Sequence, residues 1–110
     1  MRFQPLEKLM NLYDGYARAF KIDNLSLLLR QEAGTVYLTD SHCPHRGTPL
    51  ATATVIDGTI VCPSHGYCFS AVDGALLSSG QEACKPLRVY EIVYEGNELG
   101  LMVDDEAVTG

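Results

Sequence analysis

Two short runs of the sequence pair a cysteine with a histidine. The first run contains Cys43 and His45, and the second, sixteen residues further on, contains Cys62 and His65. Each run therefore offers one thiolate and one imidazole, in the pattern C-x-H-x16-C-x2-H. Two sulfur ligands and two nitrogen ligands suit an iron–sulfur cluster in which cysteines bind one iron and histidines bind the other.

Chance and zinc are the alternative explanations of this pattern. The chain has only 3 histidines, and two of them stand at short offsets from cysteines. Glycine follows both runs, at Gly47 and Gly66, where a close approach of the backbone to a bulky cofactor would require a missing side chain. Zinc also accepts two cysteines and two histidines, but zinc fingers typically pair cysteine with cysteine and histidine with histidine. The mixed runs favour the cluster, because each run can supply one ligand to each iron.

A hairpin signal explains how the two runs come together. Asp57-Gly58 is a residue pair typical of a two-residue type I′ turn, and it lies between the strand-like segments 55–56 and 59–61. Pairing of these segments folds the chain before Ala53 onto the chain after Val61. We therefore expect the ligand runs to form two loops at the open end of one hairpin, followed by a third strand over 67–70.

The rest of the chain predicts an all-β domain of antiparallel sheets, because turn signals recur about every ten residues. The segment 25–29 is largely apolar, and 35–39 is rich in β-branched and aromatic residues. A single short helical turn is expected near the N-terminus, over 5–11. The further expected strands cover residues 17–22, 25–29, 35–39, 87–94 and 98–103.

Length and charge bound the class of protein. A chain of 110 residues has the usual size of one domain, so we expect a single unit over 1–110. The formal net charge of −6 argues against nucleic acid, whose phosphates require clustered Lys and Arg. The sequence contains neither a secretory signal nor a stretch of roughly 20 apolar residues, which predicts a cytoplasmic protein without membrane contact. We also expect a monomer.

The two runs, together with Tyr67-Cys-Phe69 and Asp73-Gly74, resemble the Rieske [2Fe–2S] family. The similarity extends from about residue 17 to residue 103 and includes a proline-bearing loop over 84–87. The resemblance implies antiparallel sheets that carry a small, loop-rich cluster-binding subdomain over about 41–70. It also implies one [2Fe–2S] cluster per chain, with Cys43 and Cys62 on one iron and His45 and His65 on the outer iron.

The resemblance implies a one-electron carrier rather than an enzyme. Such a carrier would take electrons from a flavin-dependent reductase and pass them to a terminal oxygenase or another redox protein. A complete oxygenase would need a second iron held by two more histidines and a carboxylate, and only His42 remains. No G-x-G-x-x-G run for a nicotinamide or flavin is present either. The alternative is a small subunit of a larger, nitrite-reductase-like oxidoreductase, or a redox sensor.

Three positions separate this chain from the respiratory-complex branch of the family. That branch carries a disulfide between the ligand runs, and Thr48 and Ser64 occupy the matching positions here. Tyr67 replaces a serine whose hydroxyl bonds a bridging sulfide in that branch. Since hydrogen bonds to the sulfurs stabilise the reduced charge, we expect a reduction potential toward the lower end of the Rieske range.

Three further residues could take part in the chemistry. His42 directly precedes the first run and is either a simple loop histidine or a group that tunes the cluster. Cys68 lies on an expected strand, where a free cysteine usually behaves as a small buried apolar residue. Cys84 lies beside the proline loop, where exposure would make it prone to oxidation. A disulfide between Cys68 and Cys84 is compatible with the sequence but has no support in it.

Overall fold

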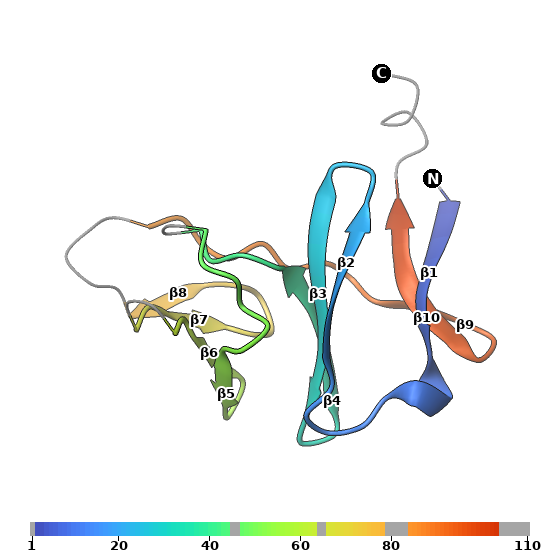
Figure 1. Ribbon diagram of the computed structural model, residues 1–110, viewed down its shortest axis with the longest axis horizontal. Helices are drawn as coiled ribbons and strands as arrows, with labels where there is room; N and C mark the ends of the chain where they lie inside the picture. Colours follow the sequence, from blue (N-terminus) through green and yellow to red (C-terminus); the bar gives the residue numbers. More distant parts are fainter. Residues whose placement is uncertain (1, 45–46, 64–65, 79–83, 104–110) are drawn as a thin grey trace.

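The computed structural model describes residues 2–44, 47–63, 66–78 and 84–103. Antiparallel strands dominate this part of the chain, and they form three sheets of order β1-β10-β9, β2-β3-β4 and β5-β6-β7-β8 (Figure 1). The expected all-β fold of antiparallel sheets is therefore confirmed. The elements are β1 (Arg2–Lys8), η1 (Leu9–Asn11), β2 (Ala17–Ile22), β3 (Leu25–Glu32), β4 (Thr35–Asp40), β5 (Thr54–Ile56), β6 (Thr59–Val61), β7 (Cys68–Ser70), β8 (Leu76–Ser78), β9 (Val93–Glu95) and β10 (Glu98–Val103).

The predicted hairpin at the centre of the chain is present. Asp57 and Gly58 both have positive φ, at 51° and 74°, as a type I′ turn requires. The flanking residues Ile56 and Thr59 are paired, and the ladder continues to Thr54 and Val61. The chain reverses direction here because Asp57 and Gly58 both tolerate the left-handed backbone region.

The helical turn expected over 5–11 is wrong for most of its length. Residues 2–8 form β1, which pairs with β10 at the other end of the chain, and only η1 is helical. Pro5 is tolerated because β1 is the edge strand of its sheet, and the register shifts between Pro5 and Glu7. Local sequence favours a turn here, but a partner more than ninety residues away along the chain decides the outcome.

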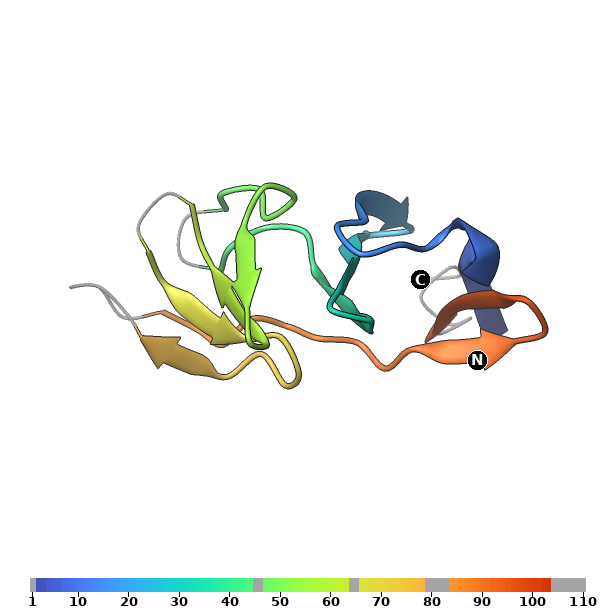
Figure 2. The same ribbon diagram turned by 90° about the horizontal axis from the view of Figure 1, so that it is seen from below.

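The strand expected over 87–94 is shorter than predicted, and a strand besides β1 was missed. Only Val93–Glu95 belongs to a sheet ladder, while Val89 forms an isolated bridge with Thr39. The missed strand is β8, which pairs with β7. The segment 84–92 instead runs along the molecule and connects the sheet of β5–β8 to β9 (Figure 2).

Two hydrophobic cores lie on opposite sides of β3. Leu27 and Leu29 are buried in one core, whereas Leu28 is buried in the other. Successive side chains of a strand point to opposite faces, so an apolar run such as 25–29 is required when both faces are covered. The first core lies between the two three-stranded sheets and contains Tyr16, Leu27, Leu29, Leu38, Leu99, Leu101 and Val103.

The second core holds both cysteines of the ligand pattern. Most of its members come from the stretch about 41–70, and Leu28, Ala71 and Leu87 complete it. The other members are Cys43, Leu50, Ala53, Ile60, Cys62, Tyr67 and Phe69. This core positions the candidate site, because two of the four predicted ligands, Cys43 and Cys62, are themselves part of it.

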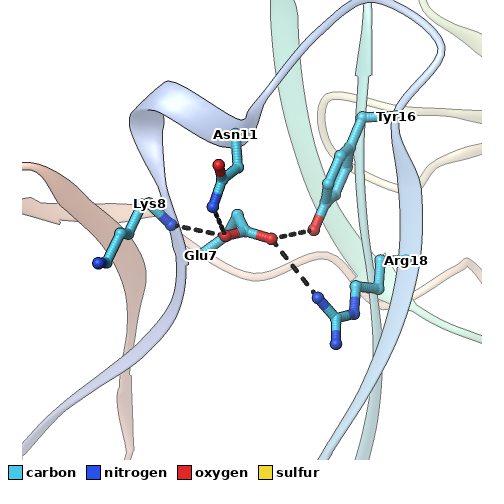
Figure 3. Close-up of polar contacts among 5 residues, drawn as sticks. All are labelled: Glu7, Lys8, Asn11, Tyr16 and Arg18. Atoms are coloured by element: carbon cyan, nitrogen blue, oxygen red, sulfur yellow. Dashed lines mark hydrogen bonds and ion pairs between the residues drawn. The ribbon is translucent and has the colours of Figure 1, made fainter.

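The side-chain carboxylate of Glu7, on β1, links that strand to β2 (Figure 3). The Glu7 side chain is 10% exposed, and it accepts hydrogen bonds from the Asn11 amide, the Lys8 backbone N–H and the Tyr16 hydroxyl. Arg18 lies 3.7 Å from the same carboxylate. These hydrogen bonds, that from Asn11 foremost, lower the pKa of Glu7. Burial and the contact with Glu7 raise the pKa of Tyr16 to about 12.

We expect Glu7→Gln to reduce the free energy of unfolding by about 1.5 kcal/mol at pH 7, because charge-assisted hydrogen bonds are lost. The lowered pKa of Glu7 means that its contribution is complete above the pKa of an unfolded glutamate, about 4.3, and is lost as the pH falls through the folded value. Urea unfolding at pH 7 and below pH 4 measures both effects. The exposed Glu95→Gln is the control, and an equal loss in both variants at pH 7 would contradict the role of Glu7.

No helix of the described residues is long and apolar enough to cross a membrane.

Candidate metal centre

In the structure, the two predicted cysteine ligands lie in the same hydrophobic core. Cys43 and Cys62 are each 1% exposed and belong to the same core. No disulfide joins Cys43, Cys62, Cys68 or Cys84 in the described part of the chain. The predicted histidine ligands His45 and His65 lie outside the described residues.

Both predicted ligand cysteines begin turns with the same hydrogen bonds. The backbone N–H of Cys43 donates to the carbonyl of Thr48 at 2.7 Å, and the N–H of Gly47 donates back to the carbonyl of Cys43 at 2.8 Å. In the second turn, the N–H of Cys62 donates to Tyr67 at 2.8 Å and that of Gly66 donates to Cys62 at 3.0 Å. Two turns of the same construction therefore hold two equivalent thiol-bearing positions.

The glycines of these turns are required by the backbone. Gly47 has φ 73° and Gly66 has φ 71°, a region that residues with a side chain rarely adopt. A Cβ at either position would meet no protein atom within 4 Å. Backbone conformation is thus sufficient to explain both glycines, and the expected close approach to a cofactor is not needed for it.

Different elements fix the two turns. The first lies between β4 and β5, and the Leu50 N–H closes its base by donating to the carbonyl of Ser41 at 2.9 Å. The second turn connects β6 to β7, whose ladder continues to the pair Val61 and Cys68. The expectation of two loops brought together beside the β5–β6 hairpin therefore agrees with the position of both cysteines.

A third segment, 84–87, packs against the turns. Cys84 is half-buried against the second core, and Leu87 is a member of it. Burial, followed by the neighbouring Cys62, raises the pKa of the Cys84 thiol. Lys85 and Pro86 are exposed. The expected proline loop therefore lies beside the candidate site, and Cys84 is half-buried there.

The remaining candidates have local partners. Cys68 is half-buried, and its thiol donates to the carbonyl of Gly66 at 3.4 Å. His42 is exposed, and its Nδ1 lies 2.7 Å from the Ser41 hydroxyl oxygen. It also lines a shallow cavity of about 310 Å³ whose other walls include Asp40 and Arg88. These contacts suit a loop histidine and a small half-buried cysteine.

The donor set fits an iron–sulfur cluster. Two buried thiols on matching turns can supply two thiolates from fixed positions, while the prolines that follow them, Pro44 and Pro63, are exposed. The described residues contain no group of three His, Cys, Asp or Glu side chains that could hold a metal ion. Completion of the site thus depends on the two histidines outside the described ranges.

Arg30 is a residue of this region that the sequence analysis missed. It is 3% exposed, and it donates to the backbone carbonyls of Leu50 and Ala53, which follow the first predicted ligand turn in the chain. A charged residue at the end of the apolar run 25–29 was the available signal.

Comparison with known proteins supports this interpretation of the site. The family model of the Rieske [2Fe–2S] domain matches residues 3–91. The cholesterol 7-desaturase of Caenorhabditis elegans is 49% identical over 49 residues, which are 43% of this chain and 11% of that protein. The chain therefore spans about a tenth of that relative.

Solved structures show the same fold. The ferredoxin of carbazole 1,9a-dioxygenase from Nocardioides aromaticivorans IC177 superposes with a TM-score of 0.76 at 24% identity, over 91% of this chain and 96% of that one. The Sphingomonas yanoikuyae B1 ferredoxin superposes with a TM-score of 0.79 at 22% identity, over 94% of this chain and 100% of that one.

Proposed function

The chain belongs to the Rieske [2Fe–2S] domain family, and from this premise we propose that it is a one-electron carrier whose single cluster is held by Cys43, His45, Cys62 and His65. The observation that carries the proposal is the burial of Cys43 and Cys62 in one core, each at the start of a turn of the same construction. When bound, the [2Fe–2S] cluster supplies uptake and release of one electron. We propose that residues 1–110 act as one domain and as a monomer.

The protein contributes fixed ligand positions. Hydrogen bonds within each turn hold the cysteine backbone, so the two thiolates need little rearrangement between redox states. Neutral imidazoles in place of two thiolates make the ligand set less negative, which favours electron uptake relative to a four-cysteine site. Pro44, Pro63 and Pro86 are exposed on the two turns and on the adjoining segment 84–87, where a redox partner can contact them.

The proposed partners are a flavin-dependent reductase as donor and a terminal oxygenase, or another redox protein, as acceptor. A ferredoxin of a dioxygenase system with the same fold and nearly the same length supports this assignment. The cytoplasm is the proposed location. The proposal makes the protein a component of an oxidoreductase system rather than a catalyst.

A second candidate function is a cluster domain fixed within a larger oxidoreductase. The match to about a tenth of a desaturase favours it, because in that protein the corresponding stretch is part of a much longer chain. Size-exclusion chromatography of the protein from its native source separates the two, since a free carrier elutes alone and a fixed subunit elutes with its partner.

Anaerobically purified protein tests the cluster itself. We expect about two iron and two sulfide ions per chain, and a rhombic EPR signal of low average g after reduction by one electron. Transfer is then tested with NADH, a flavin-dependent reductase and a terminal oxygenase, where oxygenase turnover should require this protein. A colourless protein that holds one zinc ion would contradict the proposal.

We expect a reduction potential of about −150 to 0 mV, because Thr48, Ser64 and Tyr67 remove the disulfide and the serine hydroxyl of the high-potential branch. Protein-film voltammetry at pH 7 measures it. The variant Tyr67→Ser is the matched test and should raise the potential. A wild-type value above about +150 mV would be inconsistent with this reasoning.

A further inference from the structure

Arg30 places a positive charge in the interior of the fold. Its side chain is 3% exposed, although arginine is rarely buried without a partner of opposite charge. Burial lowers the pKa of the guanidinium, and Glu32 on the same strand raises it. Arginine nevertheless stays protonated in proteins, so the charge is present under all ordinary conditions.

Arg30 lies on the face of β3 that packs in the core of Cys43 and Cys62. Leu27 and Leu29 are buried in the core between the two three-stranded sheets, whereas Leu28 is buried with Cys43 and Cys62. Because side chains alternate along a strand, Arg30 shares the face of Leu28. Its contacts agree, since both of its hydrogen bonds reach the part of the chain that follows the first ligand turn.

The guanidinium holds the base of that turn. Nη2 donates to the carbonyl of Ala53 at 3.0 Å, and Nη1 donates to the carbonyl of Leu50 at 3.4 Å. Leu50 and Ala53 are joined by a backbone hydrogen bond of 3.0 Å, and both pack in the core with Cys43 and Cys62. Leu50 also closes the first ligand turn through its bond to Ser41. Arg30 therefore touches the backbone that supports Cys43.

Hydrogen bonding alone does not account for a charged residue here. Both acceptors are neutral carbonyls, and Nε is buried with no partner among the described residues. No carboxylate of the described ranges forms an ion pair with Arg30, and Glu32, two residues along β3, supplies negative charge only from beyond ion-pair distance. A buried charge without a counter-ion is unfavourable unless negative charge lies near it. A cluster that carries thiolates and gains an electron would supply such charge.

We propose that Arg30 is a positioning residue whose buried positive charge makes reduction of the cluster more favourable. The inference rests on the proposed function, with Cys43 and Cys62 as ligands. In the reduction, one electron passes from the donor to the cluster, no bond forms or breaks at Arg30, and its proton stays in place. The reduced site is one unit more negative, and a fixed cation in a core of low dielectric constant stabilises it.

The test compares the reduction potentials of variants that hold the cluster. Arg30→Gln removes the charge and retains hydrogen-bond donors, and we expect an about tenfold smaller equilibrium constant for reduction, or about 59 mV for one electron. Arg30→Lys retains the charge and should stay closer to wild type. Lys21→Gln removes one charge from an exposed position of β2 and should leave the potential unchanged.

Salt distinguishes a buried charge from a surface charge. The shift in Arg30→Gln should persist at high ionic strength, because buried charges are screened much less than exposed ones. A purely structural role predicts weaker cluster retention or a lower melting temperature in both Arg30 variants, at an unchanged potential. An unchanged potential in Arg30→Gln, or an equal fall in Arg30→Gln and Arg30→Lys, would overturn the proposal.

Two further outcomes have definite meanings. If Arg30→Gln does not retain the cluster, Arg30→Met replaces it as the neutral variant of similar volume. Loss of the cluster from Arg30→Gln, Arg30→Met and Arg30→Lys alike would assign Arg30 a structural role and overturn the charge role. A wild-type protein without iron or sulfide would instead reject the proposed function, which separates the two failures.

Discussion

We expect Cys62→Ser to abolish cluster binding. A serine hydroxyl is a far poorer ligand than a thiolate for iron, and Cys62 is held in a buried position that no other cysteine can take without movement of the backbone. Iron and sulfide should fall from about two of each per chain to nearly none, with loss of the visible absorbance and of the EPR signal. The melting temperature should fall as well, because a cofactor that binds only the folded state stabilises it.

The control for this experiment is Cys68→Ser, six residues further along the same turn and strand. Cys68 is half-buried, and its thiol bonds the carbonyl of Gly66, so its replacement tests the loss of a sulfur close to the site. We expect wild-type iron and sulfide contents in this variant. Retention of both ions by Cys62→Ser would remove Cys62 from the ligand set, and an equal loss in Cys68→Ser would mean that the loss in Cys62→Ser does not identify a ligand.

Two local signals in the sequence predicted that Cys43 and Cys62 lie together, for a physical reason. Metal ligands are restricted to a few residue types, so a mixed Cys/His pattern is informative without any knowledge of packing. The Asp57-Gly58 turn is equally local, because both residues must adopt positive φ. These two signals were sufficient to place Cys43 and Cys62 together. The positions of His45 and His65 remain predictions.

Non-local pairing explains the elements that were missed. Strand β1 is specified by its ladder with β10 rather than by its own residues, and the sequence near Pro5 favours a turn. The segment 87–94 was expected as one strand, but its first half is held by an isolated bridge at Val89 and by single backbone hydrogen bonds. Local propensity cannot distinguish such a segment from a regular strand.

The role of Arg30 beside the candidate site could likewise not be predicted from the local sequence. Its type and its position after an apolar run were visible in the sequence, but not that Leu50 and Ala53 would lie against it. Those contacts join β3 to a turn more than twenty residues later, so only the folded chain reveals them. Residues that support a site from another element are therefore harder to predict than the ligands themselves.

We expect Gly74→Ala to cost about 2–4 kcal/mol of folding free energy, the sum of a left-handed backbone and a steric overlap. Gly74 has φ +77°, and an added Cβ would lie 1.7 Å from the carbonyl oxygen of Leu87 and 2.8 Å from its carbonyl carbon. Both are backbone atoms, so no side-chain rotation relieves the overlap. The Leu87 N–H donates to the Gly74 carbonyl at 2.9 Å, and this bond should be lost or weakened. Urea unfolding measures the difference.

The control separates the two causes, because Gly96 has a similar φ of +60° but no protein atom within 4 Å of an added Cβ. Gly96→Ala should therefore cost only about 1 kcal/mol. Leu87 belongs to the core of Cys43 and Cys62, so its displacement by Gly74→Ala should also speed the release of iron to a chelator, whereas Gly96→Ala should not. Equal stability and equal iron release in the two variants would mean that the contact between Gly74 and Leu87 does not support the site. Faster release in Gly74→Ala alone would show that the turn after β7 holds the segment 84–87 against the ligand turns.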